Sequence, residues 1–256
     1  MIKIIHYIWL GGNSLPASVK SCIKTWKKYN PDWDIVEWNE TNFPVNDFSW
    51  VKEAINAKKY AFASDFIRLW VLNKFGGVYC DTDVEFLRPL DNKLFQQGKF
   101  ICGVENLLVG TDDIKYMTYE GFDKRTGKEM QCFGMQTGFL YSEPDHPFLK
   151  YCMEKIYQNG QRRFVKPDGS YDKLIIDAAL IWAIKDFGFM FKDETQKLEK
   201  DIIIFKSNIF ATPMTKDVET YIIHWYDQSW KETKGLKEKL KKNIKKHLYF
   251  LFRKIK

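Results

Sequence analysis

The sequence lacks any apolar run long enough to cross a membrane. No window approaches the ~20 apolar residues that a membrane-spanning helix requires. The chain also does not start with a basic leader and a long apolar stretch, so we expect no signal peptide. These absences argue against an integral membrane protein and against a secreted one, and we expect a cytoplasmic location.

Cysteines with metal-binding or redox spacing are missing as well. The five cysteines are odd in number and include no Cys-x-x-Cys pair. The pattern indicates neither a disulfide framework nor a zinc site, and a reduced chain is the simplest interpretation.

The common phosphate-binding loops are absent. The Gly11-Gly12 loop matches neither Gly-x-Gly-x-x-Gly nor a P-loop, so neither dinucleotide binding nor ATP hydrolysis is indicated. What the chain does have is 45% hydrophobic and 16% aromatic residues over a length of 256. This composition indicates a folded globule with one sizeable core or at most two small ones.

The net charge of +7 is unevenly distributed. Residues 231–256 hold 11 of the 40 Lys and Arg residues but only 2 of the 33 Asp and Glu residues. The first 230 residues are therefore nearly neutral, and the basic character belongs to the tail. We expect two parts, a body of residues 1–230 and a tail of residues 231–256.

The apolar residues of the tail recur at spacings of three and four, namely Leu236, Leu240, Ile244, Leu248, Leu251 and Ile255. With lysines around that stripe, the pattern predicts a helix lying in a membrane interface. Near anionic lipids each Lys or Arg would add roughly 1 kcal/mol of attraction. A helix packed on the body or on a partner is an open alternative. A nucleic-acid-binding tail is disfavoured, because no basic recognition fold accompanies it.

Residues 60–91 contain two charged residues within an apolar helix. The first half of this stretch is apolar on almost every side, which predicts a buried helix. Asp65 and Arg68 lie three positions apart in it, so they project from one face as neighbours. Buried charges are costly unless they are paired or bind a ligand. The pair is therefore a candidate for a functional site.

Two further carboxylates follow this helix. Gly76-Gly77 ends it, and Val78-Tyr79-Cys80 begins a strand that we expect to carry Asp81-Thr82-Asp83. Alternate residues of a strand point the same way, so both carboxylates would face one site. Such a pair can hold a divalent cation, which can take a diphosphate as its remaining ligands. The alternative is a solvated turn.

The start of the chain predicts a parallel sheet. Residues 2–9, 17–29 and 34–38 have the patterns of a strand, a helix and a strand, which make a βαβ unit. Nucleotides bind at the carboxyl ends of such strands, so Trp9 and the Gly11-Gly12 loop are placed to meet one. A core tryptophan is an equally good explanation of Trp9.

The remaining patterns predict strands at residues 100–104, 133–141, 202–205 and 221–224, and helices at residues 147–157 and 174–187. Asp177 interrupts an apolar part of the second helix, and we expect it to be a capping or structural carboxylate; binding of donor or acceptor is the alternative. His224 follows an apolar strand, and a lone histidine is more often a core residue than a ligand.

Four segments together resemble the sugar-nucleotide-binding region of the Asp-x-Asp glycosyltransferases, and most closely glycosyltransferase family 32. They are residues 2–12 (IKIIHYIWLGG), 63–68 (ASDFIR), 76–83 (GGVYCDTD) and 224–230 (HWYDQSW). The resemblance implies an α/β fold, a GT-A-like, Rossmann-related single domain whose central sheet is mixed and mainly parallel.

The resemblance also implies a set of donor-binding residues: Trp9, Gly11, Ser64, Asp65, Arg68, Asp81, Ser229 and Trp230. In such enzymes the tryptophan lies against the base, and the first Asp of the motif reaches ribose or sugar hydroxyls. Asp65 would fix the sugar and Arg68 a phosphate, since a guanidinium suits bidentate contact with an oxyanion.

The same resemblance implies a metal site and a catalytic group. Asp83, with help from Asp81 and His224, would hold a divalent cation. Imidazole is a good ligand for Mn²⁺ and a poor one for Mg²⁺, which favours manganese. Asp65, Arg68 and Gln136 would be catalytic.

Gln136 and its neighbour Thr137 correspond to residues near the transferred sugar. Family members often carry Asn here, and this sequence departs from that. Residues 110–131 form a long polar segment, which we expect to be a loop that contributes to acceptor selectivity.

The activity implied is transfer of a sugar, with retention of configuration, from a UDP- or GDP-sugar to a hydroxyl. The tail suggests a lipid-linked acceptor, such as a surface polysaccharide repeat unit on the inner face of a bacterial plasma membrane. No residue is an evident covalent nucleophile, and no nucleic acid is expected as a partner.

Three alternatives stay open. A haloacid-dehalogenase-like phosphohydrolase would use Asp81 as nucleophile and Asp83 as acid, but Glu85 stands where its Asp-x-Asp-x-Thr motif needs a hydroxyl. A protein-glucosylating toxin would share the Asp-Arg helix and the Asp-x-Asp motif, but no secretion segment is evident. A non-catalytic membrane-docking module would make the acidic pair structural.

Overall fold

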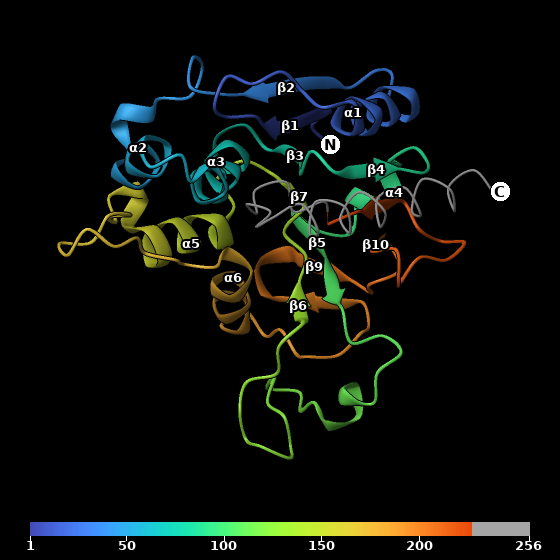
Figure 1. Cartoon of the computed structure of the whole chain (residues 1–256). Coiled ribbons are helices and arrows are strands. Elements are labelled where there is room, and N and C mark those ends of the chain that lie inside the picture. The colour runs from blue at the N-terminus through green and yellow to red at the C-terminus, as the bar shows by residue number, and fades with distance from the viewer. Residues whose placement is uncertain (227–256) are drawn as a thin grey trace, which may run out of the picture. The chain divides into compact units, whose positions relative to one another are not determined.

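An eight-stranded sheet is the centre of the computed structural model, which describes residues 1–226 (Figure 1). Its strands lie in the order β2-β1-β3-β7-β5-β9-β8, and β6 pairs with β5 outside this path. Their bounds are β1 Ile4–Ile8, β2 Asp34–Trp38, β3 Gly77–Cys80, β5 Phe100–Asn106, β6 Phe133–Met135, β7 Phe139–Ser142, β8 Gln196–Leu198 and β9 Ile202–Phe205. Strands β2, β1, β3, β5 and β9 run in one direction, and β7, β8 and β6 run in the other.

The βαβ unit predicted at the start of the chain is confirmed. The helix α1 (Ala17–Tyr29) connects β1 to β2, and the two strands pair in parallel with Ile5 opposite Ile35. β3 pairs in parallel on the other side of β1, so the carboxyl ends of β1 and β3 lie at the same edge of the sheet. Trp9 follows β1 at that edge, and Asp81 follows β3 there.

Helices cover both faces of the sheet. In Figure 1, α1 lies apart from α2 (Ser49–Asn56), α3 (Tyr60–Phe75), α5 (Pro147–Tyr157) and α6 (Ile176–Lys185). The buried side chains form two clusters, and consecutive residues of β9 alternate between them. Ile202 and Ile204 pack with α3 and α5, whereas Ile203 packs in the cluster of Trp26 from α1. Successive residues of a strand point to opposite faces, so β9 contributes to both cores.

A second, three-stranded sheet was not expected from the sequence. It consists of β10 (Phe210–Ala211), β11 (Ile222–His224) and β4 (Val84–Phe86), with β11 in the middle. β11 pairs antiparallel with β4, which places His224 opposite Val84. Residues 140 positions apart in sequence are thereby brought next to each other.

The buried helix predicted from residue 60 onward is α3, and two glycines end it as expected. Gly76 and Gly77 have φ angles of +65° and +92°. Both lie in the left-handed region that favours glycine. A Cβ at Gly77 would also stand 2.7 Å from the carbonyl oxygen of Ile4 in β1. The turn into β3 therefore needs glycine for its conformation and for its close contact with β1.

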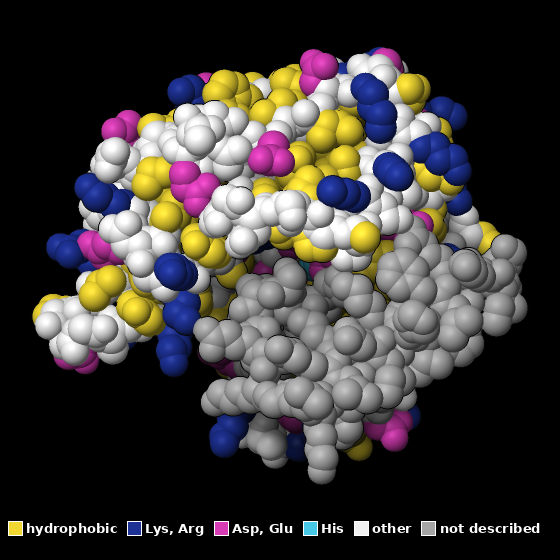
Figure 2. Space-filling model, turned by 45° about the horizontal axis from the view of Figure 1, so that its top comes forward, with side chains coloured by type: hydrophobic (Ala, Val, Ile, Leu, Met, Phe, Trp, Pro, Cys, Tyr) yellow, Lys and Arg dark blue, Asp and Glu magenta, His cyan; other side chains and the backbone are white. Residues whose placement is uncertain are grey.

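The remaining elements are short: α4 (Asn92–Phe95) and the 3-10 helices η1 (Val45–Asp47), η2 (Asp113–Tyr116), η3 (Gln158–Gly160) and η4 (Glu199–Asp201). Within residues 1–226, no helix has the length and apolarity to span a bilayer. Acidic and basic side chains are interspersed on the face that Figure 2 shows, in agreement with the nearly neutral body of the sequence.

Two sequence predictions were wrong in local detail. Residues 133–141 form two strands, β6 and β7, because residues 136–138 between them have no strand pairing. Asp81, Thr82 and Asp83 lie in a turn and not in a strand, because here the chain passes from the large sheet to the small one. The predicted tail of residues 231–256 lies outside the described residues, and the boundary predicted at residue 230 stays a prediction.

Candidate active site

The turn after β3 brings two carboxylates to the carboxyl edge of the large sheet. The backbone N–H of Asp81 donates to the carbonyl of Gly138 at 2.8 Å, and that of Val84 donates to the carbonyl of Asp81 at 3.0 Å. Both carboxylates do face one site, as predicted, but the turn is responsible and not the alternation of a strand. Its two ends are held by β3 in one sheet and β4 in the other.

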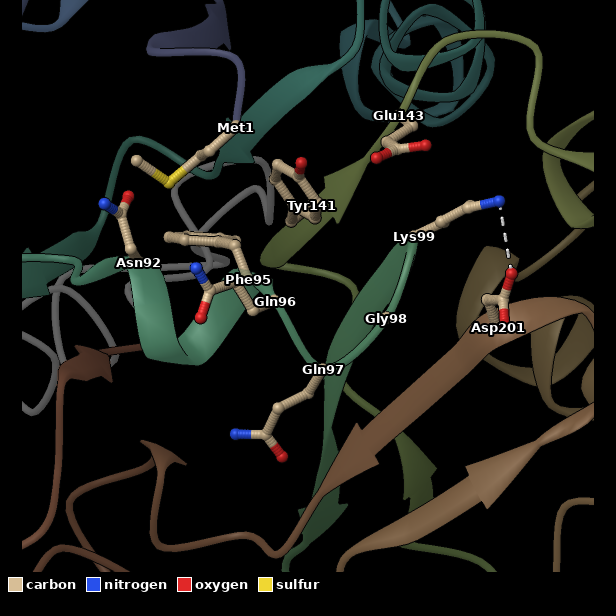
Figure 3. Close-up of a pocket in the computed structure, with 10 residues that line it drawn as sticks. All are labelled: Met1, Asn92, Phe95, Gln96, Gln97, Gly98, Lys99, Tyr141, Glu143 and Asp201. Carbon is tan, nitrogen blue, oxygen red and sulfur yellow. Dashed lines mark ion pairs between the residues drawn. The ribbon is translucent and has the colours of Figure 1, made fainter.

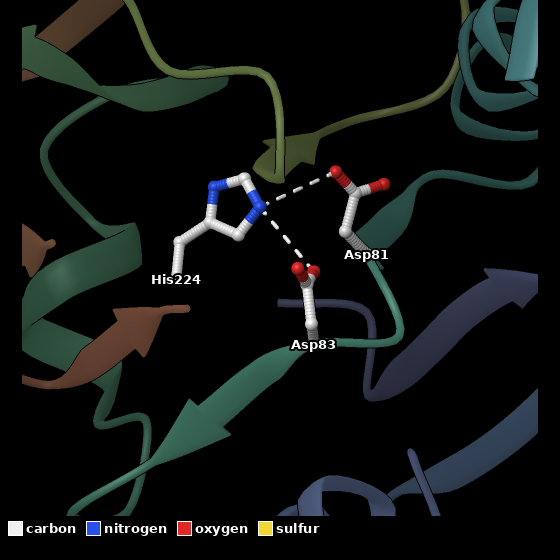
Figure 4. A group of neighbouring side chains, drawn as sticks. All are labelled: Asp81, Asp83 and His224. Atoms are coloured by element: carbon white, nitrogen blue, oxygen red, sulfur yellow. Dashed lines mark ion pairs between the residues drawn. The ribbon is translucent and has the colours of Figure 1, made fainter. Parts of the chain in front are cut away.

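His224 completes a cluster with these carboxylates. Its Nε2 lies 3.3 Å from Oδ1 of Asp83 and 3.7 Å from Oδ2 of Asp81. One ligand atom from each of the three residues lies within 4.8 Å of the other two. Figure 4 shows the Nε2 edge of the ring directed at both carboxylates. Two carboxylate oxygens and an imidazole nitrogen form a donor set that suits a divalent cation.

The electrostatics of the cluster fit a cation. Burial lowers the pKa of His224, but the carboxylates of Asp83, Asp81 and Glu105 outweigh burial and raise it to about 9. A site that favours a proton on an enclosed imidazole has a strongly negative potential. The same potential favours a divalent metal ion, so the three predicted metal ligands fit the group that the motif implies.

Asp65 and Arg68 lie beside this cluster on α3. The guanidinium of Arg68 contacts Oδ1 of Asp65 at 2.7 Å and Oδ1 of Asp81 at 3.5 Å, and it donates to the carbonyl of Thr137 at 3.1 Å. It also lies over the ring of Tyr79, whose hydroxyl donates to Asp81 at 2.6 Å. Arg68 and Tyr79 therefore orient the carboxylate of Asp81. The predicted contact of Arg68 with a donor phosphate stays a prediction.

Asp65 is a buried carboxylate with an altered affinity for protons. Burial raises its pKa to about 7, and Asp177 and Asp81 add to the shift, whereas Arg68 opposes it. At neutral pH such a group is poised between accepting and donating a proton.

Gln136 and Thr137 occupy the break between β6 and β7. Neither Nε2 nor Oε1 of Gln136 has a partner among the described residues, although the side chain is only 1% exposed. A buried amide without partners is costly and suggests a polar ligand. Thr137 donates through Oγ1 to Oδ1 of Asp177 at 2.5 Å. Asp177 lies in the first turn of α6 and is connected to the site by this hydrogen bond.

The other predicted donor-binding residues make their hydrogen bonds with residues outside the Asp81 cluster. Trp9 is half-buried and donates through Nε1 to the carbonyl of Asn13 at 2.6 Å. The backbone N–H of Gly11 donates to Glu40 at 2.7 Å, and the hydroxyl of Ser64 donates to the carbonyl of Ala61 at 2.8 Å. Their contacts with a donor stay predictions. The predicted residues Ser229 and Trp230 lie outside the described residues.

The sequence predictions gave no role to three residues near the cluster, namely Glu105, Gly138 and Tyr226. Glu105 lies on β5, and burial and Asp177 raise its pKa to about 7. Its carboxylate accepts a hydrogen bond from the hydroxyl of Tyr226. Gly138 carries the carbonyl that holds Asp81. The sequence signal that could have identified Glu105 is its position: it is an acidic residue directly after the apolar run 100–104.

A cavity of about 440 Å³ lies at the opposite edge of the sheet (Figure 3). Its lining includes Met1, Lys99 and Asp201, which precede β1, β5 and β9, and Lys99 pairs with Asp201 at 3.3 Å. These are the amino ends of the parallel strands, whereas ligands of open α/β sheets bind at the carboxyl ends. The Asp81 cluster is therefore the better candidate site.

Comparisons with known proteins agree with this placement. Residues 16–101 match the family described as a glycosyltransferase sugar-binding region containing a DXD motif. Inositol phosphoceramide mannosyltransferase 1 of Schizosaccharomyces pombe is 23% identical over 171 residues, which are 64% of this chain and 45% of the relative. Inositol phosphoceramide mannosyltransferase 3 of the same yeast is 33% identical over 97 residues, 35% of this chain and 26% of the relative. The chain thus spans less than half the length of the curated relatives it matches.

The solved structures to which the chain is similar include two glycosyltransferases. The PaToxG glycosyltransferase aligns with a TM-score of 0.44 and 18% identity, over 72% of this chain and 69% of that one. The galactosyltransferase LgtC, solved with donor and acceptor sugar analogues, aligns with a TM-score of 0.43 and 11% identity over 87% of each chain. Asp81-Thr82-Asp83 is the Asp-x-Asp motif of the matched region. The match over residues 16–101 confirms the resemblance of two of the four segments, residues 63–68 and 76–83, to the DXD-containing sugar-binding region of the glycosyltransferases.

Proposed function

We propose that the protein is a metal-dependent glycosyltransferase that moves a sugar from a nucleotide-sugar donor to a hydroxyl group, with retention of anomeric configuration. The observation that carries this proposal is the convergence of His224 with Asp81 and Asp83 of the Asp-x-Asp motif. Two ligands from the turn after β3 and one from β11 of the small sheet meet at the carboxyl edge of the parallel strands, where a nucleoside diphosphate and a cation can bind together.

The chemical difficulty of the reaction is the departure of a nucleoside diphosphate. A divalent cation bound by Asp81, Asp83 and His224 would supply the positive charge that stabilises this leaving group. Arg68 holds Asp81 and Asp65 in place through its guanidinium. Gln136 would offer sugar hydroxyls an amide donor and acceptor, neither of which has a partner within residues 1–226.

The acceptor that we propose is a lipid-linked glycan. Two observations support this choice: the curated relatives are named as mannosyltransferases of inositol phosphoceramide, and the sequence of residues 231–256 is basic and amphipathic. We propose that the enzyme binds the cytoplasmic face of a membrane through this tail. The relatives' names make a mannose donor the first to test, and surface polysaccharide repeat units are the second acceptor class to test.

The proposal is tested by thermal unfolding with Mn²⁺ and a panel of UDP- and GDP-sugars. A donor at about a hundred times its dissociation constant should stabilise the protein by roughly 2.7 kcal/mol. We expect one nucleotide class to stabilise the wild type only when metal is present, and not to stabilise Asp83→Ala. The matched control is Asp32→Ala, which removes an exposed carboxylate paired with Lys3 and should respond like the wild type.

Failure of every donor to stabilise the wild type in the presence of Mn²⁺ would contradict the proposal. Stabilisation of Asp83→Ala to the same extent would contradict the role of the cluster. The stereochemical part is checked separately by NMR of the product, in which the one-bond coupling between C1 and H1 should indicate the same anomeric configuration as in the donor.

A further inference from the structure

The imidazole of His224 is covered by an aromatic ring two residues further along the chain. The ring centroids of His224 and Tyr226 lie 4.0 Å apart, and the planes differ by 29°. Tyr226 reaches this position with a φ angle of +51°, in the left-handed region that non-glycine residues adopt rarely. A tyrosine held in this conformation needs interactions that compensate its cost.

Glu105 supplies such an interaction from the large sheet. The hydroxyl of Tyr226 donates to Oε1 of Glu105, which lies on β5 one residue before the strand ends. The register of β5 is set by two neighbours, because Glu105 pairs with Gly134 of β6 while Gly103 pairs with Phe205 of β9. The hydroxyl of Tyr226 is thus anchored to a strand that contributes no metal ligand.

The backbone between the two rings is anchored to the small sheet. The N–H of Trp225 donates to the carbonyl of Asp83 at 3.1 Å, and its indole donates to Glu85 at 3.0 Å. These contacts fix the main chain of residue 225 beside the Asp-x-Asp turn. They leave the orientation of the His224 ring to its neighbours, which are Tyr226 on one side and the backbone of Gly138 on another.

We propose that Glu105 and Tyr226 are positioning residues for the metal site. Glu105 holds the tyrosine hydroxyl, and the tyrosine ring holds the imidazole of His224 with Nε2 toward Asp81 and Asp83. Partners that orient a ligand in this way commonly change metal affinity by 10–100-fold when they are removed. The inference rests on the proposed metal-dependent function and deepens it, because it names residues that shape the site without binding the cation.

The first measurement is made without metal and follows the ring protons of His224 by NMR. Their signals are assigned by their absence in His224→Gln. In the wild type the stacked Tyr226 ring should shift them upfield. We expect Glu105→Ala and Tyr226→Leu to remove most of that shift. An unchanged shift in Glu105→Ala would overturn the anchoring role of Glu105, whatever the protein does with metals.

The second measurement is Mn²⁺ affinity, from the electron paramagnetic resonance signal of the free ion. We expect Glu105→Ala and Tyr226→Phe each to weaken binding by at least about tenfold. The double variant should be no weaker than either single variant, because both break the same contact. Glu105→Gln keeps an acceptor for the tyrosine hydroxyl and should recover most of the affinity.

The outcomes separate this inference from the function on which it rests. Wild-type protein that binds no Mn²⁺ would overturn both. Wild-type protein that binds Mn²⁺, with Tyr226→Phe binding equally well, would overturn the positioning role alone. Additive losses of Mn²⁺ affinity in the double variant would also overturn the positioning role. The same holds if Glu105→Gln bound Mn²⁺ as weakly as Glu105→Ala, since the charge of Glu105 would then act without Tyr226.

Discussion

Gly138 lies against the ring of His224 so closely that a Cβ at position 138 would stand 2.7 Å from the ring atoms Cε1 and Nδ1. The same Cβ would lie 3.2 Å from Oδ2 of Asp81, and the carbonyl of Gly138 accepts the hydrogen bond that holds the Asp81 backbone. The absence of a side chain at residue 138 therefore lets the backbone just before β7 lie against both His224 and Asp81.

Gly138→Ala should weaken Mn²⁺ binding by at least about tenfold, because the methyl group must displace the His224 ring or the Asp81 carboxylate. Calorimetric titration with Mn²⁺ checks this. In a His224→Ala background the same substitution should cost little stability, since the ring that obstructs the methyl group is gone. A Gly138→Ala protein with wild-type Mn²⁺ affinity would contradict the arrangement.

Arg68 is a buried cation that contacts the carboxylates of Asp65 and Asp81, and its side chain is only 7% exposed. Arg68→Met should lower the free energy of unfolding by about 3–5 kcal/mol, because it leaves Asp65 and Asp81 without their charge partner. Arg68→Lys should rescue it only in part, because an ammonium cannot match the planar guanidinium. Urea denaturation without metal measures both.

Arg125→Met is the matched control for Arg68, since Arg125 also contacts two aspartates but is 44% exposed. We expect it to change stability by no more than about 1 kcal/mol. Equal losses in Arg68→Met and Arg125→Met would show that burial of the Arg68 cluster contributes nothing.

Asp65 should make stability fall as the pH rises. Its pKa is raised from 3.8 to about 7 in the folded protein, so the folded state binds more protons than the unfolded state between these values. The stabilisation is fully present below the unfolded pKa and is lost as the pH rises through about 7. The charged or titratable groups that act on Asp65 are Arg68, Tyr79, Asp81, Tyr157 and Asp177.

The measurement compares the unfolding of the wild type and Asp65→Asn in urea, with a chelator, from about pH 5 to about pH 8. The stability difference, wild type minus variant, should decrease with pH at a slope of up to about 1.4 kcal/mol per pH unit. Asp32→Asn is the control, because the pKa of exposed Asp32 is lowered and it does not titrate in this window. A difference that is constant with pH would show that Asp65 stays ionised as the partner of Arg68.

Thr137 connects α6 to the site through its hydroxyl. Thr137→Val should reduce the free energy of unfolding by about 1.5–3 kcal/mol, because the carboxylate of Asp177 loses the hydrogen bond that the hydroxyl of Thr137 donates to it. Thr137→Ser keeps the hydroxyl and should remain close to the wild type. Chemical denaturation measures both variants. A Thr137→Val protein as stable as the wild type would contradict the contribution of this hydrogen bond.

Local patterns were sufficient for much of the fold. The helix predicted at residues 17–29 has those bounds in the structure, and the strand at residues 34–38 pairs in parallel with the first strand as the βαβ pattern requires. These elements follow from short-range periodicity, glycine and proline positions, and the burial that apolar runs demand. The Asp65 and Arg68 pair was also accessible, because a three-residue spacing on a helix places two side chains together in any context.

The sequence by itself determined the chemistry of the candidate site, since Asp81, Asp83 and His224 were identifiable as possible ligands from their residue types and motifs. Only the tertiary structure decided that they meet. The turn after β3 crosses between two sheets, and the pairing of β11 with β4 brings His224 to Asp83 across 141 residues of sequence. The contact of Glu105 with Tyr226 and the closeness of Gly138 to His224 were decided in the same way. Such contacts depend on strand order and register, which are set by the packing of the whole core and leave no periodic signal in the residues that make them.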